Sequence, residues 1–114
     1  VRKLTEKYPD FYPMYTQEGA WKHQGPAWTD WSDGFLPGMM WMFGRRSETG
    51  SDEQKFWTDQ AIKYTKPLAR RRLDPDLHDL GFLFLPTFYR WYTQTRDSGV
   101  RDVLVDAGRN LSSR

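Results

Sequence analysis

The chain has 114 residues, with 17 lysines and arginines against 15 aspartates and glutamates, and a formal net charge of +2 at neutral pH. This near balance argues against a nucleic-acid-binding surface, and the absence of cysteine excludes disulfides, thiolate metal sites and a cysteine nucleophile. No apolar run approaches the roughly 20 residues that a membrane-spanning helix needs. Aromatic residues make up 17% of the chain, so we expect a core built largely of rings.

The first elements predicted are the end of a helix, an inner helix and an outer helix. Residues 1–8 fit a helix end, and the proline- and tyrosine-rich stretch that follows is predicted as a loop ordered by its aromatic rings. Residues 34–46 are apolar nearly all round, as in a helix surrounded by other helices. Ser51 or Asp52 can cap the next helix, and Pro67 is expected to bend or end it. The apolar residues of that helix form one stripe: Trp57, Ala61, Tyr64 and Leu68.

The same pattern returns in the second half of the chain. Residues 80–92 are again apolar nearly all round. After a polar turn, a second one-sided stripe follows: Val100, Val103, Leu104, Ala107 and Leu111. A helical repeat with a period of roughly 40 to 50 residues indicates a solenoid or a closed toroid. Because one repeat cannot bury its apolar face alone, we expect this all-α chain to be a piece, cut at both ends, of a longer protein and to expose apolar surface.

Two segments occupy equivalent places in the repeat, residues 29–35 and 77–82, each just before an inner helix. In a toroid the N-terminal ends of inner helices converge at one rim, where their unpaired N–H groups favour an anionic ligand. An aspartate before a helix is most often its cap, and this is the interpretation we prefer for Asp33. In and just before the second segment, three aspartates could each cap: Asp74, Asp76 and Asp79. Asp79 is therefore the stronger candidate for a functional carboxylate.

Other residues near the rim carry weaker signals. His78 adds a titratable group beside Asp79, although a lone histidine is more often structural than a ligand or base. His78 and His23 lack metal-ligand spacing, so we predict no metal site. The arginines at residues 70–72 fit a solvated helix end. Three tryptophans flank the rim, and one of them could be a platform for a sugar ring: Trp28, Trp31 and Trp41.

Taken together, residues 30–41, Asp-Trp-Ser-Asp-Gly-Phe-Leu-Pro-Gly-Met-Met-Trp, and residues 78–82, His-Asp-Leu-Gly-Phe, closely resemble the unsaturated glucuronyl hydrolases, glycoside hydrolase family 88. The resemblance spans nearly the whole chain and includes the turn at residues 49–52 and the stretch at residues 107–111. It implies an (α/α)6 toroid of six helical hairpins. Residues 1–114 would then be the N-terminal portion of one catalytic domain, about two hairpins and the end of a preceding helix.

The resemblance also implies an activity and a set of site residues. Enzymes of this family remove a terminal unsaturated glucuronic acid from oligosaccharides made by polysaccharide lyases, by adding water across the C4–C5 double bond. Asp79 would be the assisting catalytic carboxylate, and Trp31 and His78 would contact the substrate. The acid–base aspartate of the family lies further along the chain, so residues 1–114 alone are expected to be inactive. The partner implied is an unsaturated uronyl oligosaccharide, with no cofactor, nucleic acid or membrane.

Two alternatives remain open. One is the related family that removes unsaturated galacturonic acid from rhamnogalacturonan, which the segment at residues 78–82 disfavours. The other is a non-enzymatic helical-repeat binding module, in which the inner aromatic residues are only core and Asp79 is only a cap. Pro86 departs from the family pattern and is expected to kink the second inner helix.

Overall fold

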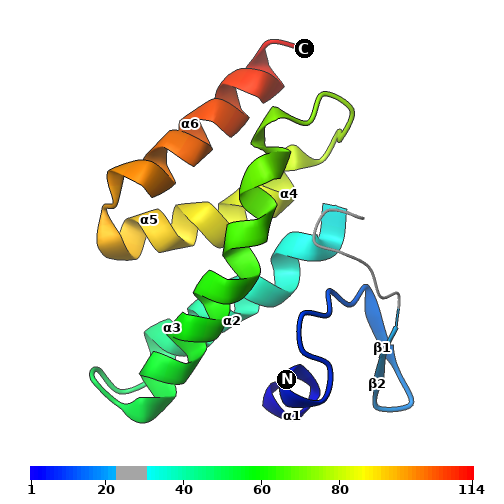
Figure 1. Cartoon of the computed structure of the whole chain (residues 1–114), viewed down its shortest axis with the longest axis vertical. Coiled ribbons are helices and arrows are strands. Elements are labelled where there is room, and N and C mark those ends of the chain that lie inside the picture. The colour runs from blue at the N-terminus through cyan, green and yellow to red at the C-terminus, as the bar shows by residue number, and fades with distance from the viewer. Residues whose placement is uncertain (23–30) are drawn as a thin grey trace.

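The computed structural model describes residues 1–22 and 31–114, and most of these residues are helical (Figure 1). In chain order the elements are α1 (Arg2–Lys7), β1 (Tyr15–Gln17), β2 (Ala20–Lys22), a 3₁₀ helix (Trp31–Gly34), α2 (Phe35–Arg46), α3 (Asp52–Thr65), a 3₁₀ extension of α3 (Lys66–Leu73), α4 (Leu80–Phe84), a π-helical turn (Leu85–Tyr89), α5 (Arg90–Thr95) and α6 (Ser98–Ser112). The all-α prediction is confirmed, and the arrangement fits part of a helical toroid. No described helix combines the length and the apolar composition that crossing a membrane requires.

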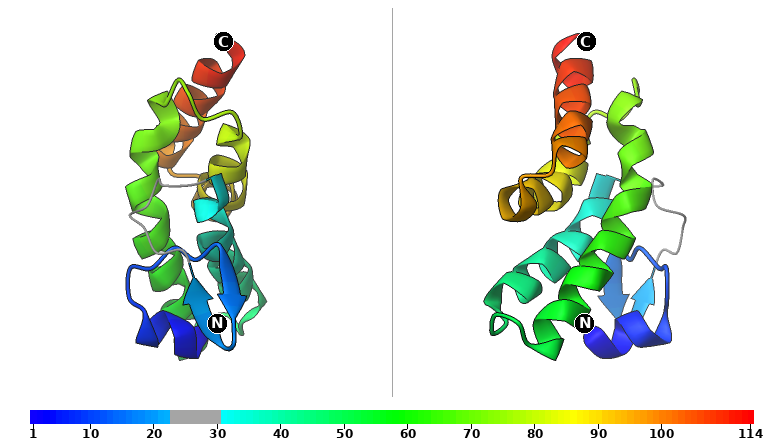
Figure 2. Two further views of the ribbon diagram at one scale, coloured as in Figure 1. Left: turned by 90° about the vertical axis from the view of Figure 1, so that its right-hand side faces the viewer. Right: turned by 60° about the vertical axis from the view of Figure 1, so that its left-hand side comes forward.

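Two helical hairpins follow one another along the chain. α2 turns back into α3, and the stretch α4–α5 turns back into α6 (Figures 1 and 2). Each return helix begins at a side-chain cap. The Ser51 hydroxyl accepts a hydrogen bond from the Gln54 N–H at 3.1 Å, which confirms one of the two predicted caps of α3. The Asp97 carboxylate accepts one from the Val100 N–H at 3.0 Å and so caps α6.

The core lies between the helices and is rich in rings, as the composition predicts. The whole predicted stripe of α3 and its extension is buried: Trp57, Ala61, Tyr64 and Leu68. Trp41 of α2 is 2% exposed, and its indole N–H donates to the Thr65 hydroxyl at 3.0 Å. The Trp41 ring also stacks on Trp91 of α5, with 5.7 Å between the ring centroids. One side chain of the first hairpin thus contacts both its own return helix and the second hairpin.

Apolar surface is exposed, as expected for a piece of a helical repeat. In the α6 stripe Val100 and Ala107 are buried, but Leu111 is 42% exposed. Leu85 in the second inner helix is 63% exposed, so the prediction that residues 80–92 are covered all round does not hold within this chain. An apolar groove runs between α4 and α6, lined by Leu80, Gly81, Phe84, Leu85, Leu104, Ala107, Gly108 and Leu111.

Two prolines lie where the helix type changes, and the prediction that Pro67 bends or ends its helix is confirmed. Pro67 falls where α3 ends, and the chain continues as the tighter 3₁₀ helix. Pro86 falls in the π-helical turn between α4 and α5. A proline has no N–H to donate, and the wider π turn accommodates it without ending the helical path. The Thr87 hydroxyl donates to the Leu83 carbonyl within this turn.

The stretch after α1 contains a β-hairpin that the sequence analysis did not predict. β1 and β2 pair antiparallel, with Thr16 opposite Trp21. Glu18 and Gly19 at the turn have φ angles of 50° and 72°, the left-handed conformation that a two-residue hairpin turn requires. Predicting only a loop here was therefore wrong. The expected ordering by aromatic rings is confirmed, because Trp21 packs against Tyr8 and Phe11 with centroid separations of 6.1 and 6.0 Å.

The two inner helices touch backbone to backbone at two glycines. A Cβ atom at Gly34 would lie 2.4 Å from the Phe82 carbonyl oxygen, and one at Gly38 would lie 2.8 Å from Cβ of Pro86. These separations leave no room for a methyl group. The N-terminal ends of α2 and α4 can therefore approach only because glycine occupies position 34.

Gly34→Ala is expected to lower the free energy of unfolding by about 2 kcal/mol, because the new methyl group meets a backbone oxygen that cannot rotate away. The φ of Gly34 is −77°, which alanine adopts without strain, so the loss reports the contact alone. Gly108→Ala in α6 is the matched control, because nothing lies within 4 Å of its added Cβ. The control is expected to be neutral or to stabilise by up to about 1 kcal/mol. Urea unfolding followed by circular dichroism measures both, and equal effects of the two changes contradict the account.

Candidate functional site

The rim predicted from the sequence exists where the 3₁₀ helix before α2 packs against α4. Gly34 lies against the backbone of Phe82 and Leu83, so the starts of the two inner helices are neighbours. The two segments that occupy equivalent places in the repeat therefore meet in space, as far as the described residues of the first segment extend. We call this region the rim.

Three exposed rings gather at the rim, and we call them the aromatic cluster: Trp31, Phe35 and Phe82. The ring centroids of Trp31 lie 5.7 Å from Phe35 and 5.6 Å from Phe82, and the two phenylalanines are 5.8 Å apart. All three side chains keep about 40 to 50% of their surface in contact with solvent. Clusters of large exposed rings are unusual on a protein surface unless they bind something.

The sequence analysis found only one member of the aromatic cluster. Trp31 was selected with Trp28, which lies outside the described residues, and Trp41, which is buried and bonded to Thr65 and so cannot be a platform. Phe35 and Phe82 were missed. The signal for them was present, because each directly follows a glycine at the start of an inner helix in the repeat.

Asp33 does not cap α2. Gly34 stands at the N-cap position of this helix, so the preferred interpretation of Asp33 was wrong. Asp33 lies one residue earlier, within the 3₁₀ helix, and is 2% exposed. The extra 3₁₀ turn moves the helix start past the aspartate, which a reading of local sequence alone did not anticipate.

Asp79 occupies the N-cap position of α4, but its carboxylate makes no capping hydrogen bond. Its backbone carbonyl accepts a hydrogen bond from the Phe82 N–H at 2.9 Å. Asp79 and Phe82 of the aromatic cluster thus belong to the same helical turn. The Asp79 side chain is half-buried, and His78 beside it is exposed. The interpretation of Asp79 as only a cap thus lacks the hydrogen bond that it requires.

The start of α4 carries no side-chain capping hydrogen bond, and Asp74 instead holds the loop that precedes this helix. Its carboxylate accepts the N–H groups of Asp76 at 2.8 Å and Leu77 at 2.9 Å. Its second oxygen lies 2.8 Å from the Arg71 guanidinium. Asp74 therefore shapes the loop at residues 74–79, at whose end Asp79 lies.

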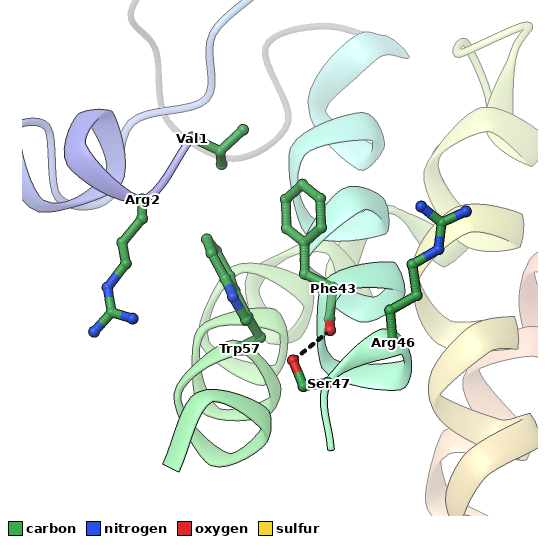
Figure 3. Close-up of a pocket in the computed structure, with 6 residues that line it drawn as sticks. All are labelled: Val1, Arg2, Phe43, Arg46, Ser47 and Trp57. Atoms are coloured by element: carbon green, nitrogen blue, oxygen red, sulfur yellow. Dashed lines mark hydrogen bonds between the residues drawn. The ribbon is translucent and has the colours of Figure 1, made fainter. Parts of the chain in front are cut away.

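Among the described residues, two cavities reach the rim, because one is lined in part by Ser32 and Phe35 and the apolar groove between α4 and α6 begins at Leu80 and Gly81. Other cavities lie away from it. One is lined by Val1, Arg2, Phe43, Arg46, Ser47 and Trp57, at the C-terminal end of α2 (Figure 3). Ser47 there donates to the Phe43 carbonyl at 2.8 Å, and Arg2 pairs with Glu53 at 2.6 Å. Within residues 1–22 and 31–114, no three histidine, aspartate or glutamate side chains are grouped as a metal site would need.

The chain is similar to two curated hydrolases. It is 32% identical over 114 residues to the unsaturated glucuronyl hydrolase of Bacillus sp. (strain GL1), an alignment that covers 96% of this chain and 28% of the relative. It is 28% identical over 86 residues to the unsaturated chondroitin disaccharide hydrolase of Streptococcus pneumoniae, covering 75% of this chain and 21% of that relative. No family model and no solved structure matches the chain. The chain thus spans about a quarter of the length of these relatives.

The hydrogen bonds at Asp74 predict an acid-dependent loss of stability. Burial raises the pKa of the Asp74 carboxyl, but the N–H groups of Leu77 and Asp76 lower it. The guanidinium groups of Arg71 and Arg114 lower it too, so that the pKa falls below its ordinary value of 3.8. A depressed pKa gives stability that is present above the ordinary value and is lost as pH falls through the folded value.

Asp74→Asn is therefore expected to lower the free energy of unfolding at pH 7 and to flatten its decline between about pH 5 and pH 2. Urea unfolding of both proteins across this pH range measures the difference. A variant that declines with acid as steeply as the wild type contradicts the assignment.

Proposed function

We propose that the chain is the N-terminal part of the catalytic domain of a glycoside hydrolase that removes a terminal 4,5-unsaturated glucuronic acid from oligosaccharides produced by polysaccharide lyases. The observation that carries this proposal is the similarity, over 96% of the chain, to a hydrolase named for unsaturated glucuronyl substrates. The second relative is named for an unsaturated chondroitin disaccharide, a substrate of the same chemical class. An aromatic cluster next to a carboxylate without a capping bond is an arrangement that suits such a sugar.

The proposed reaction is the hydration of an enol ether. A general acid transfers a proton to C4, positive charge develops at C5 and the ring oxygen, and water adds its oxygen to C5 while a base takes its proton. The resulting hemiketal opens by breaking the bond between C5 and the ring oxygen. This leaves a ketone at C5 and a hydroxyl at C1, and the C1 hemiacetal then releases the rest of the oligosaccharide.

In this proposal Asp79 acts in its charged form. A carboxylate near C5 stabilises the positive charge that develops when C4 is protonated. The proton donor is a second carboxylic acid, supplied by sequence beyond residue 114. That assignment rests on the family resemblance and on the quarter of the relatives' length that this chain spans.

Trp31 and His78 bind the substrate in this proposal. The unsaturated ring is flattened at C4 and C5, so it stacks well on a flat indole. Phe35 and Phe82 both pack against the Trp31 ring, with the Phe35 ring at 89° to it. His78 is exposed next to Asp79, where it can donate a hydrogen bond to a sugar oxygen.

Asp79→Asn in the full-length protein is expected to lower kcat on an unsaturated uronyl disaccharide by a factor of about 100 or more. The amide has the same shape but no charge, so stability should change by less than about 0.5 kcal/mol. The assay follows the loss of absorbance of the conjugated double bond. Asp76→Asn is the matched control, because this exposed aspartate lies in the same loop and makes the same change of charge.

The control is expected to keep wild-type kcat. Full activity in the Asp79→Asn protein rules out a catalytic role for this carboxylate. A wild-type protein that consumes no unsaturated uronyl disaccharide favours the binding module instead.

Trp31→Ala is expected to raise KM about tenfold, which corresponds to about 1.4 kcal/mol of lost stacking, with a smaller effect on kcat. Its side chain is 41% exposed, so thermal stability should change little. Tyr89→Ala is the control. Tyr89 is similarly exposed but lies away from the rim, two turns beyond Phe82 on the second inner helix. Initial rates over a range of disaccharide concentrations give both constants. An unchanged KM contradicts the platform role.

A further inference from the structure

The loop that carries His78 and Asp79 is held in place by α6. The Asn110 side-chain amide donates one hydrogen bond to the Arg72 carbonyl at 3.0 Å and another to the Asp74 carbonyl at 2.8 Å. These contacts join residues 36 and 38 positions apart in the sequence. Figures 1 and 2 show the C-terminal half of α6 beside this loop. Asn110 is half-buried, so water competes only partly for the two carbonyls.

Arg71 fixes the Asp74 side chain of the same loop. The guanidinium of Arg71 lies 2.8 Å from the Asp74 carboxylate, and both side chains are largely shielded, at 10% and 22% exposed. That carboxylate in turn holds the N–H groups of Asp76 and Leu77. Arg114 also donates to the Asp74 carbonyl and, at 2.5 Å, to the Leu77 carbonyl. Asn110 and Arg114 therefore hold the backbone of the loop, and Arg71 holds the Asp74 side chain.

These contacts determine where Asp79 lies. Leu77 packs against the hydrophobic core, and Asp79 follows two residues later, where its carbonyl accepts the Phe82 N–H. The Asp79 carboxylate itself makes no capping hydrogen bond at the start of α4. No capping hydrogen bond therefore fixes the Asp79 side chain, and the loop backbone that carries it is held by the contacts described above.

We propose that Asn110 is a positioning residue for Asp79, acting through the carbonyl of Asp74 and the turn that Asp74 holds. This inference rests on the proposed function, because it assigns Asn110 to the reaction in which Asp79 acts. Displacement of a catalytic group by about 1 Å can cost about 100-fold in rate, even when the mutated residue never touches the substrate.

Asn110→Asp provides the sharpest test. It keeps the shape of the side chain but replaces two donated hydrogen bonds with a carboxylate that faces two carbonyl oxygens, which repels the loop. Asp106→Asn is the matched control. It weakens another contact of Arg72 with α6, in which Arg72 Nε lies 3.3 Å from the Asp106 carboxylate, without touching the loop at residues 74–79.

In the full-length protein, Asn110→Asp is expected to lower kcat on an unsaturated uronyl disaccharide about 100-fold and to change KM less than about threefold. The Asp106→Asn control is expected to stay within about twofold of wild type. Amide hydrogen exchange should accelerate at residues 76–80 in the Asn110 variant alone.

Asn110→Gln, which keeps the amide on a longer side chain, should restore part of kcat. If the Asp variant does not fold, Asn110→Ala removes the donor without adding charge and decides in the same way.

Three unfavourable outcomes are distinguishable. If wild type is active and a folded Asn110 variant keeps its kcat, the positioning role is wrong and the proposed function stands. If the control loses as much kcat as Asn110→Asp, general loosening of α6 explains the effect and the positioning role is also wrong. If wild type itself acts on no unsaturated uronide, the proposed function fails and the role of Asn110 fails with it.

Discussion

The structure depends on the direct backbone contact between its two inner helices at Gly34. With no side chain there, the 3₁₀ helix before α2 lies against the carbonyl of Phe82, and Gly38 repeats the contact one turn later against Pro86. This approach brings the starts of two helical repeats to one rim. It also brings together Trp31, Phe35 and Phe82, which come from both repeats. A candidate site thus arises from packing between hairpins, and each hairpin supplies only part of it.

Sequence periodicity predicted the helices well because burial of one face needs apolar residues at regular spacing. The stripe from Trp57 to Leu68 and the Ser51 cap are local signals, and both are confirmed. The β-hairpin was missed because Glu18-Gly19 is a weaker turn signal than asparagine-glycine, and its strands are only three residues long. Asp33 was assigned wrongly because the 3₁₀ turn that displaces the helix start has no local sequence signature.

The candidate site was predictable only in part, for a related reason. Asp79 was a candidate from its place in the repeat, and Trp31 was one of three candidate tryptophans. Only the family resemblance assigned their functional roles, which stay predictions. The sequence could not show that Asp74 holds the loop through its carboxylate while the Asp79 carboxylate makes no capping hydrogen bond. Either aspartate could have capped, and which of them forms hydrogen bonds depends on residues far away in the sequence. Asn110 lies 36 residues beyond Asp74, and no local pattern links the two. Nonlocal hydrogen bonds of this kind determine where the loop lies once the helices have packed.

The central claim is that the rim binds an unsaturated uronic acid between Asp79 and Trp31. The most direct test is a crystal structure of the full-length Asp79→Asn protein soaked with an unsaturated uronyl disaccharide. The account predicts that the unsaturated ring lies against the Trp31 indole, with C5 or the ring oxygen within about 3 Å of the side chain at position 79. A sugar bound elsewhere, such as in the cavity beside Phe43 and Trp57, with the rim empty, would contradict it.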